Sequence, residues 1–287
     1  MEGRRPAAGR PGPEGRVVKR KAVKVCVVTG FGINADEELA LAFDLAGADA
    51  SRVHVKDLID DPRLIDSFRI LAFPGGFSFG DHLGSGKVFA LLFGRSLKGP
   101  MEEFLSRGGL AIGICNGFQV LVKMGFLPNL SGKWEQEASL IQNESGKFED
   151  RWVGVSFDAE SPCIWTRGMP AVDLQVRHGE GRFVVKSPAV LSALESRHLA
   201  AAHYSSPDGG PVAYPLNPNG SITDIAGICD PTGRVFGLMP HPEAYNFPQT
   251  HPEWHRRKPG DGEWSGGGLG IFRAGVAFAA GEAPQAP

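Results

Sequence analysis

Cys115 is the residue of this chain best placed for nucleophilic chemistry. It directly follows the apolar run Leu110–Ile114 and has a glycine two positions away on each side, in the sequence GICNGFQ at 113–119. Small residues on both sides permit the sharp strand-to-helix turn that presents a nucleophile. The first amides of the following helix would stabilise a thiolate there. The pattern therefore predicts a cysteine nucleophile in preference to a buried structural cysteine.

His241 is the best candidate for the base that such a nucleophile needs. It lies in the sequence MPHPE, at the end of the apolar run 234–239. Ligands and reacting groups of open α/β sheets gather at the carboxyl edge of the strands, so we expect the imidazole near Cys115. Glu243, two residues further on, can orient the ring and stabilise its protonated form.

The tripeptide His-Pro-Glu occurs a second time, at 251–253. No apolar strand precedes this copy, so we interpret it as part of a loop. His251 and His255 have an i, i+4 spacing that could hold a metal ion. With Pro252 between them and no third ligand nearby, we predict a surface loop and no metal site.

A glycine-rich segment, PGGFSFGD at 74–81, follows another apolar run at 69–73. Glycines let backbone N–H groups approach a developing oxyanion closely, and the amide of Asn116 could supply a second donor. Taken alone, the segment is equally typical of a plain strand-to-helix turn.

The elements that must position these residues alternate between apolar runs and amphipathic segments. Strands are expected at 23–29, 52–56, 69–73, 110–114 and 234–239, and helices from a capping box at Asn34–Glu37, at 88–93 and 101–105, from 115 to 124, and at 271–280. This alternation predicts an α/β fold with a mostly parallel sheet flanked by helices. Shorter segments predict a smaller antiparallel β annex, with strands at 152–157, 173–176, 182–185 and 222–229. A single domain over residues 23–287 is the simplest organisation.

Composition and charge exclude several classes of protein. The chain has 287 residues, 42% of them hydrophobic, and a formal net charge of -2. It contains no apolar run of about 18 residues and no secretory leader pattern, so we expect a cytoplasmic protein without a membrane span. The four cysteines show no CxxC spacing, which argues against a disulfide framework or structural zinc.

Residues 1–22 differ from the rest, because seven Lys and Arg face only two Glu in a segment rich in Gly and Pro. We expect a disordered basic tail. A basic arm can contact nucleic acid, but a solvated extension is the favoured interpretation, and no nucleic acid partner is expected.

A competing motif precedes the cysteine. GFGINA at 30–35 fits the dinucleotide-binding fingerprint, and Asp57 lies about where a ribose-binding acid would be. This alternative leaves Cys115 and His241 without a role. A Walker A phosphate loop is missing from the sequence, so ATP binding by this chain is not expected.

Four segments give the chain a resemblance to class I (triad) glutamine amidotransferases. They are PGGFSFGD at 74–81, GICNGFQVL at 113–121, RHGEGRF at 177–183 and NGSITDIAGICDPTGRVFGLMPHPE at 219–243. The resemblance extends from about Val23 to Phe278 and is greatest to the glutaminase subunits of phosphoribosylformylglycinamidine synthases, which act in purine biosynthesis. It implies a flavodoxin-like fold.

The resemblance also implies roles for individual residues. Cys115 matches the nucleophile, His241 the general base and acid, and Glu243 the residue that orients the histidine. The remaining matches are oxyanion or substrate-binding positions: Gly76, Phe77, Asn116, Gln119, His178 and Gly179. The substrate implied is L-glutamine.

No cofactor or metal is expected in this chain, whereas ATP and Mg are expected on a large synthetase subunit that receives the ammonia. A small bridging subunit is a further partner that the resemblance allows. Three other functions stay open, namely another class I amidotransferase, a cysteine hydrolase of the same architecture, and a dinucleotide-binding protein.

Overall fold

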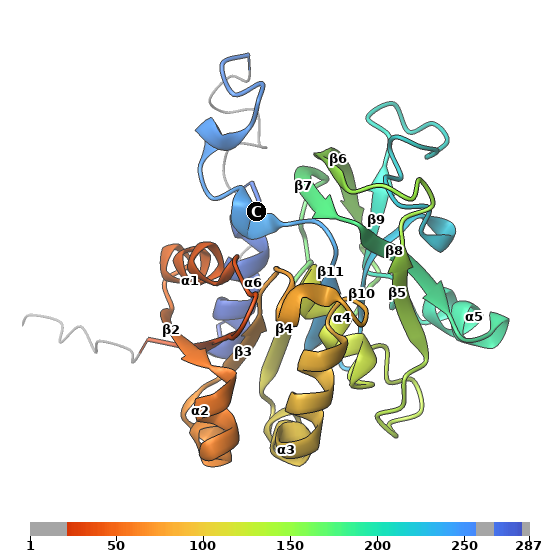
Figure 1. The fold of residues 1–287 in the computed structure, drawn as a ribbon. Helices are drawn as coiled ribbons and strands as arrows, with labels where there is room; N and C mark the ends of the chain where they lie inside the picture. The colour runs from red at the N-terminus through yellow and green to blue at the C-terminus, as the bar shows by residue number, and fades with distance from the viewer. Residues whose placement is uncertain (1–21, 257–266, 283–287) are drawn as a thin grey trace, which may run out of the picture.

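The computed structural model describes residues 22–256 and 267–282. Its helices and strands are drawn in Figure 1. The predicted basic tail at 1–22 lies outside the described residues except for Ala22. The boundary between tail and domain therefore stays a prediction.

A nine-stranded sheet forms the centre of the molecule, with the strand order β2-β1-β3-β4-β11-β10-β9-β6-β7. Its first five strands are parallel: β2 (Asp49–His54), β1 (Lys24–Thr29), β3 (Ile70–Phe73), β4 (Leu110–Ile114) and β11 (Val235–Leu238). Every residue of β3, β4 and β11 is buried, as expected for central strands covered on both faces. This order is that of flavodoxin-like sheets, so the predicted fold class is confirmed.

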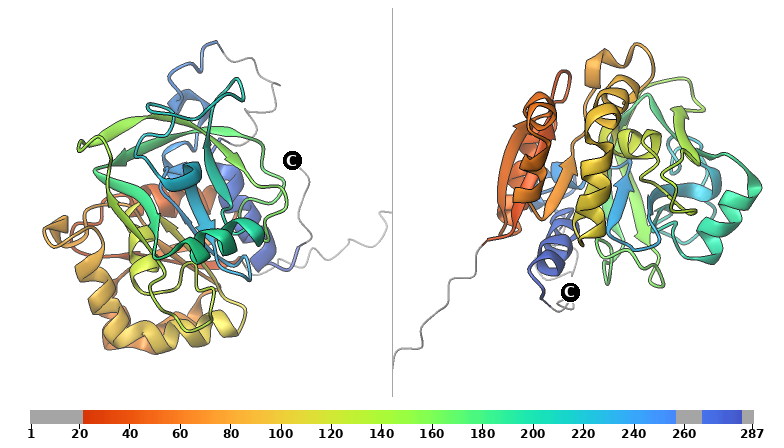
Figure 2. Two further views of the ribbon diagram at one scale, coloured as in Figure 1. Left: turned by 90° about the vertical axis from the view of Figure 1, so that its right-hand side faces the viewer. Right: turned by 90° about the horizontal axis from the view of Figure 1, so that it is seen from below.

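Helices cover both faces of the parallel part (Figure 2). α1 (Asp36–Leu45) packs against α6 (Leu269–Ala279), and α3 (Lys87–Ser106) packs against α4 (Asn116–Lys123). The chain leaves β1 toward one edge of the sheet and leaves β3 toward the other. Right-handed crossovers therefore place α1 and α3 on opposite faces.

The predicted antiparallel annex is present, and most of it continues the main sheet. β10 (Ile225–Cys229), β9 (Ala202–Ser205), β6 (Glu149–Phe157) and β7 (Val172–His178) are paired antiparallel to one another along the sheet. A separate two-stranded sheet joins β5 (Ala138–Gln142) to β8 (Glu180–Val185). Two further helices are α2 (Val55–Asp60) and α5 (Pro188–Ser196).

Some predicted boundaries are wrong, each for a local reason. The capping box at Asn34 does not form: α1 begins at Asp36, because the backbone of Asn34 is paired with Gly75 instead. The second strand ends at His54, whose Nδ1 accepts a hydrogen bond from Lys56 N at 3.1 Å and so begins α2.

The two helical segments predicted at 88–93 and 101–105 belong to the single helix α3, with Pro100 inside it. β5, β9, α2 and α5 were not predicted. They are short elements, and α5 begins with a proline at its first position, where proline is tolerated in a helix.

Candidate active site

Cys115 lies at a strained turn between β4 and α4. Its φ of 50° and ψ of -106° are unusual for a residue with a side chain. Its amide donates to Leu238 O of the neighbouring strand at 2.8 Å. A Cβ on Gly117 would lie 1.9 Å from Phe73 O, so glycine is required there because the turn runs against the backbone of β3. The predicted strand–turn–helix arrangement around the cysteine is therefore present.

His241 and Glu243 form a buried pair just beyond the end of β11. The distance from His241 Nδ1 to Glu243 Oε1 is 2.6 Å, and the residues are 3% and 1% exposed. The backbone of the histidine is fixed by a 2.8 Å hydrogen bond from its amide to Gln175 O. Burial lowers the pKa of His241, but the charges of Glu243 and Cys115 outweigh burial and raise it to about 10. The pair thus favours a protonated imidazole beside the Cys115 side chain.

Gly75 marks the point where the three parallel strands bring these side chains together. A Cβ on Gly75 would lie 2.6 Å from His241 Cε1 and 3.5 Å from Cys115 Cβ. Gly75 follows β3, Cys115 follows β4 and His241 follows β11, and these three strands are neighbours. The carboxyl edge of the sheet therefore assembles the site, as the sequence predicted.

No hydrogen bond of ordinary geometry joins the Cys115 sulfur to the imidazole, although the Cys115 side chain lies close enough to raise the pKa of the ring. The Cys115 thiol also donates to the backbone carbonyl of Arg177 at 3.9 Å. His241 Nε2 is buried without a hydrogen-bond partner among the described residues. Such contacts are often long in the absence of substrate and shorten in the substrate complex.

The two predicted oxyanion donors are the backbone amides of Gly76 and Asn116. Gly75 O and Phe77 N pair with residues 32–35, which leaves the Gly76 N–H out of this pairing. Gly76 has a φ of +146°, a conformation that favours glycine. Asn116 is the first residue of α4, and its amide has no intrahelical acceptor. Both predicted donors therefore lie at the edge that carries Cys115.

The segment GFGINA is used for packing, in conflict with the dinucleotide-binding alternative. Asn34 N and Ala35 N donate to Gly75 O at 3.4 and 3.3 Å, and Gly32 O accepts from Phe77 N at 2.8 Å. These groups are not free to hold a pyrophosphate. Asp57 is exposed in the first turn of α2, three residues beyond the end of β2. The structure thus disfavours this alternative.

Gln119 joins α4, the helix that follows Cys115, to the start of β8. Its Nε2 donates to Glu180 O at 2.5 Å, and its Oε1 accepts from Asn116 Nδ2 at 3.1 Å. Asn116 Nδ2 also lies 3.3 Å from Asp81 Oδ1 at the end of the glycine-rich segment. Two hydrogen-bonding positions of the Gln119 amide are occupied within the protein, and its contact with substrate stays a prediction.

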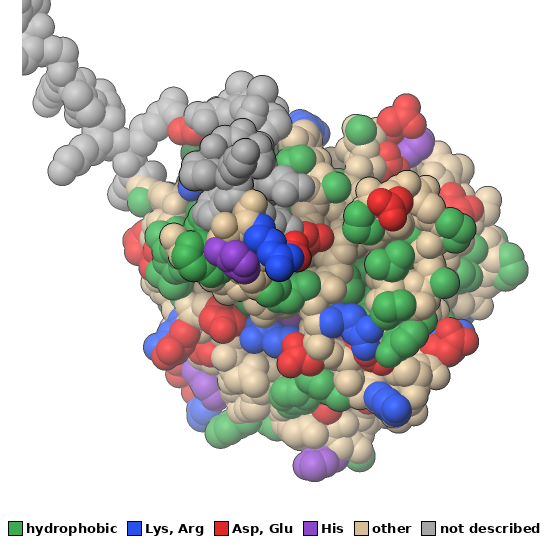
Figure 3. Space-filling view, turned by 90° about the horizontal axis from the view of Figure 1, so that it is seen from above, with side chains coloured by type: hydrophobic (Ala, Val, Ile, Leu, Met, Phe, Trp, Pro, Cys, Tyr) green, Lys and Arg blue, Asp and Glu red, His purple; other side chains and the backbone are tan. Residues whose placement is uncertain are grey.

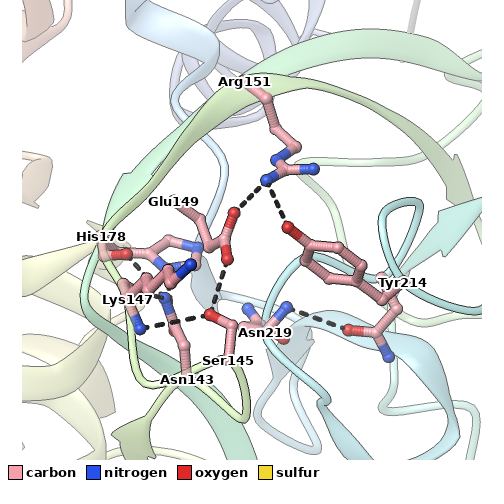
Figure 4. A network of polar contacts seen from close by, with 9 residues as sticks. Asn143, Ser145, Lys147, Glu149, Arg151, His178, Tyr214 and Asn219 are labelled. Atoms are coloured by element: carbon pink, nitrogen blue, oxygen red, sulfur yellow. Dashed lines mark hydrogen bonds and ion pairs between the residues drawn. The ribbon is translucent and has the colours of Figure 1, made fainter.

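His178 is fixed in a polar network of the annex (Figure 4). Its Nδ1 lies 3.2 Å from Asn143 Oδ1, while Asn143 Nδ2 donates to His178 O at 2.8 Å. Burial and then the charge of His241 lower the pKa of His178 to about 3, so the ring is neutral. The network extends through Glu149 and Arg151 to Tyr214, whose hydroxyl accepts from Arg151 Nη2 at 3.0 Å. Its hydrogen bonds hold His178 to Asn143 and not to the triad.

Phe77 and Gly179 lie at the outer side of these loops. The Phe77 ring is 45% exposed and lies 6.2 Å from the Phe148 ring, centroid to centroid. A Cβ on Gly179 would lie 3.8 Å from Phe148 Cδ2. The exposed Phe77 and Phe148 rings therefore lie near each other, with Gly179 beside Phe148.

The second His-Pro-Glu copy differs from the predicted loose loop. His251 is 4% exposed, its Nε2 lies 3.3 Å from Asp173 Oδ2, and its ring packs 4.7 Å from that of Trp152. These neighbours fix His251 in the annex, although no strand precedes it. Within the described residues, no group of three or more His, Cys, Asp or Glu is arranged to hold a metal ion.

Two further observations concern the cysteines and the helices of the described residues. All four cysteines are buried and free of disulfides. In residues 22–256 and 267–282, no helix is both long and apolar enough to cross a membrane.

Gly75 and Arg177 were missed as site residues. Gly75 belongs to a segment already noted for its glycines, but only the tertiary contact with His241 distinguishes it from Gly76. Arg177 lies 3.2 Å from His241 Nδ1 through its Nη2. It directly precedes His178 in RHGEGRF, and this position in the segment could have marked it as a site residue.

Similarity to known proteins shows which family the chain belongs to. The model of the CobB/CobQ-like glutamine amidotransferase domain matches residues 22–279, so the chain belongs to this family.

Among individual proteins, the chain is 42% identical over 259 residues to the phosphoribosylformylglycinamidine synthase subunit PurQ of Dehalococcoides mccartyi, covering 90% of this chain and 98% of that protein. It is 40% identical to PurQ of Methanococcus maripaludis strain S2, covering 82% of this chain and 87% of that protein. A solved structure of PurLQS from Thermotoga maritima matches with a TM-score of 0.65 and 27% identity, covering 90% of this chain and 99% of that chain. The predicted class I glutamine amidotransferase family is confirmed.

Proposed function

We propose that the chain is the glutaminase subunit of a phosphoribosylformylglycinamidine synthase. It hydrolyses L-glutamine and passes ammonia to a synthetase subunit that converts formylglycinamide ribonucleotide to the amidine. The similarity to PurQ subunits over nearly their whole length supports the choice of synthase. The observation that carries the chemistry is that Cys115 and the buried His241–Glu243 pair converge on Gly75.

Glutamine hydrolysis begins with attack on the side-chain amide. The Cys115 sulfur forms a bond to the amide carbon, and the carbonyl oxygen becomes an oxyanion that the Gly76 and Asn116 amides stabilise. Losing one such donor costs a factor of roughly 10² to 10³ in rate in other enzymes. His241 gives its Nε2 proton to the nitrogen, the C–N bond breaks, and ammonia leaves behind a glutamyl thioester.

Hydrolysis of the thioester completes the cycle. His241, now neutral, takes a proton from a water molecule whose oxygen bonds to the thioester carbon. The C–S bond then breaks and the thiolate is released beside the imidazolium, together with glutamate. Glu243 stabilises the protonated ring in both half-reactions.

The ammonia released has to reach a second reaction, because free ammonia is protonated near neutral pH and is then no longer nucleophilic. We therefore place ATP and Mg on the synthetase subunit, with a small bridging subunit as a third component, and the complex in the cytoplasm. On the face drawn in Figure 3, acidic and basic side chains of the described residues are interspersed. That face lacks the single-sign basic surface typical of nucleic acid binding.

Glutaminase activity of the Cys115→Ala variant tests the chemistry. We expect the wild-type chain to hydrolyse glutamine weakly alone and faster after mixing with the synthetase subunit, and the variant to bind glutamine without hydrolysing it. A diazoketone analogue of glutamine should label Cys115 in the wild type. Full activity of Cys115→Ala would refute the assignment. Activation by the synthetase subunit of a different amidotransferase, and not by that of the purine enzyme, would point to the other members of the family.

A further inference from the structure

Arg177 contacts both Cys115 and His241. Its Nη2 lies 3.2 Å from His241 Nδ1 and donates to Glu38 Oε2 at 3.1 Å. Its backbone carbonyl accepts the Cys115 thiol at 3.9 Å. The side chain is 32% exposed, so its charge is partly shielded from water.

The contact between Arg177 and His241 Nδ1 is not a second hydrogen bond. Nδ1 has one position for a hydrogen bond, and Glu243 Oε1 occupies it at the shorter distance of 2.6 Å. The Arg177 guanidinium is therefore a cation placed beside the imidazole. A neighbouring positive charge disfavours the imidazolium, whereas the Glu243 carboxylate favours it.

β7 fixes this cation in place. Gln175 and Arg177 are two residues apart on the strand, so their side chains project from the same face. Gln175 O accepts the His241 amide at 2.8 Å, so the same strand holds the histidine backbone. The position of Arg177 relative to the ring is thus set by the sheet as well as by Glu38.

The charged and titratable groups around the His241 ring come from four elements. Among the described residues they are Cys115 at the start of α4, Arg177 and the neutral His178 at the end of β7, Glu243 in the ring's own turn, and Glu38 of α1 through Arg177. In the free enzyme, the Cys115 side chain and Glu243 both favour the protonated ring. Acylation of Cys115 turns its sulfur into a neutral thioester and removes this contribution, and Glu243 and Arg177 then oppose each other.

We propose that Arg177 is a positioning residue that keeps His241 neutral in the glutamyl-thioester state, so that the ring can accept a proton from the hydrolytic water. Glu38 limits this effect by pairing with the guanidinium. The inference rests on the proposed glutaminase function and assigns a residue to its second half-reaction. In that step the water oxygen bonds to the thioester carbon, the proton goes to His241 Nε2, and the sulfur leaves as thiolate.

The pH dependence of kcat at saturating glutamine tests this role, measured on the complex with the synthetase subunit. Arg177→Met should move the acid limb of the profile up by about one pH unit, a shift at the lower end for a charge this close because Glu38 offsets part of it. Below the limb, kcat should then fall about tenfold and recover at higher pH. Glu38→Gln should move the limb down, because it leaves the cation uncompensated.

Two further variants serve as controls. Arg177→Lys should return the limb toward its wild-type position. Arg52→Met removes another arginine that pairs with α1, through Glu37 at 2.8 Å, and should leave the limb in place. A uniform loss of activity at every pH in Arg177→Met, with the limb unmoved, would refute the inference and indicate a structural role. Should Arg177→Met fail to fold, the opposite shift in Glu38→Gln still decides.

The failure of this inference differs from the failure of the proposed function. A wild-type complex without Cys115-dependent glutaminase activity would remove the proposed function itself. An active wild type whose acid limb is the same in Arg177→Met and Glu38→Gln would remove only the role of Arg177.

Discussion

Gly75→Ala should disable the site while sparing the fold. The new Cβ would lie 2.6 Å from His241 Cε1, whereas ordinary contacts begin at 3.4 Å, so the ring has to move by 0.8 Å. The φ of Gly75 lies outside the left-handed region, and the backbone therefore accepts alanine. A misplacement of about 1 Å costs roughly 10²-fold in rate. Overpacking costs roughly 1–3 kcal/mol, which a domain with about 5–15 kcal/mol of stability tolerates.

Steady-state glutaminase kinetics and thermal unfolding together measure this prediction. We expect kcat to fall roughly 10²-fold and the Tm to fall by about 2–4 °C per kcal/mol lost. Gly94→Ala on α3 is the matched control, because its new Cβ would meet no atom within 4 Å apart from the neighbouring backbone of its own helix. That change should leave kcat unaltered. A folded Gly75→Ala protein with wild-type kcat would show that His241 does not occupy the position described.

Two further predictions concern Glu243, which is paired with His241, and Gln119, which lies on α4. Burial lowers the pKa of His241, while the charges of Glu243 and Cys115 raise it to about 10, above the ordinary 6.5. The pair thus stabilises the fold fully below pH 6.5 and loses this contribution as the pH rises through about 10. Glu243→Gln should therefore lower the Tm most at neutral and acid pH, and the Tm values of the variant and the wild type should converge above pH 10. The same variant should lower kcat roughly 10²- to 10⁴-fold. An equal loss of Tm at every pH would contradict this link between protonation and stability. Gln119→Ala removes the 2.5 Å hydrogen bond to Glu180 O. The KM for glutamine should then rise about tenfold, with kcat little changed. An unchanged KM would exclude a role of Gln119 in holding the segment around Glu180 at the substrate.

The central strands and the residues at their ends could be predicted because they depend on local sequence patterns. The apolar runs that became β3, β4 and β11 are buried on both faces and contain no alternation with polar residues. The residue after each run then lies at the carboxyl edge by the geometry of parallel strands. Cys115 and His241 could be paired in this way although 126 positions separate them in the chain.

The predicted start of α1 was wrong, and the motif in the GFGINA segment was misleading, because tertiary contacts outweigh the local preference of these residues. Asn34 has a good capping side chain, yet its backbone pairs with Gly75 and the helix starts later. The glycines of GFGINA match a phosphate-binding motif, yet a Cβ on Gly32 would lie 2.1 Å from Phe77 O. These glycines are needed because two loops pack closely. A motif cannot distinguish that requirement from the close approach of a ligand.

The amino-acid sequence by itself determined which chemical groups the protein possesses and which strand ends carry them, because periodicity and glycine placement act within a few residues of each other. The tertiary structure alone decided the distances between those groups. The guanidinium of Arg177 beside the His241 ring and the close approach of Gly75 to Cys115 and His241 join segments that lie far apart in the chain. Proton affinities depend on charges a few ångströms away, and such proximity arises only once the sheet has assembled.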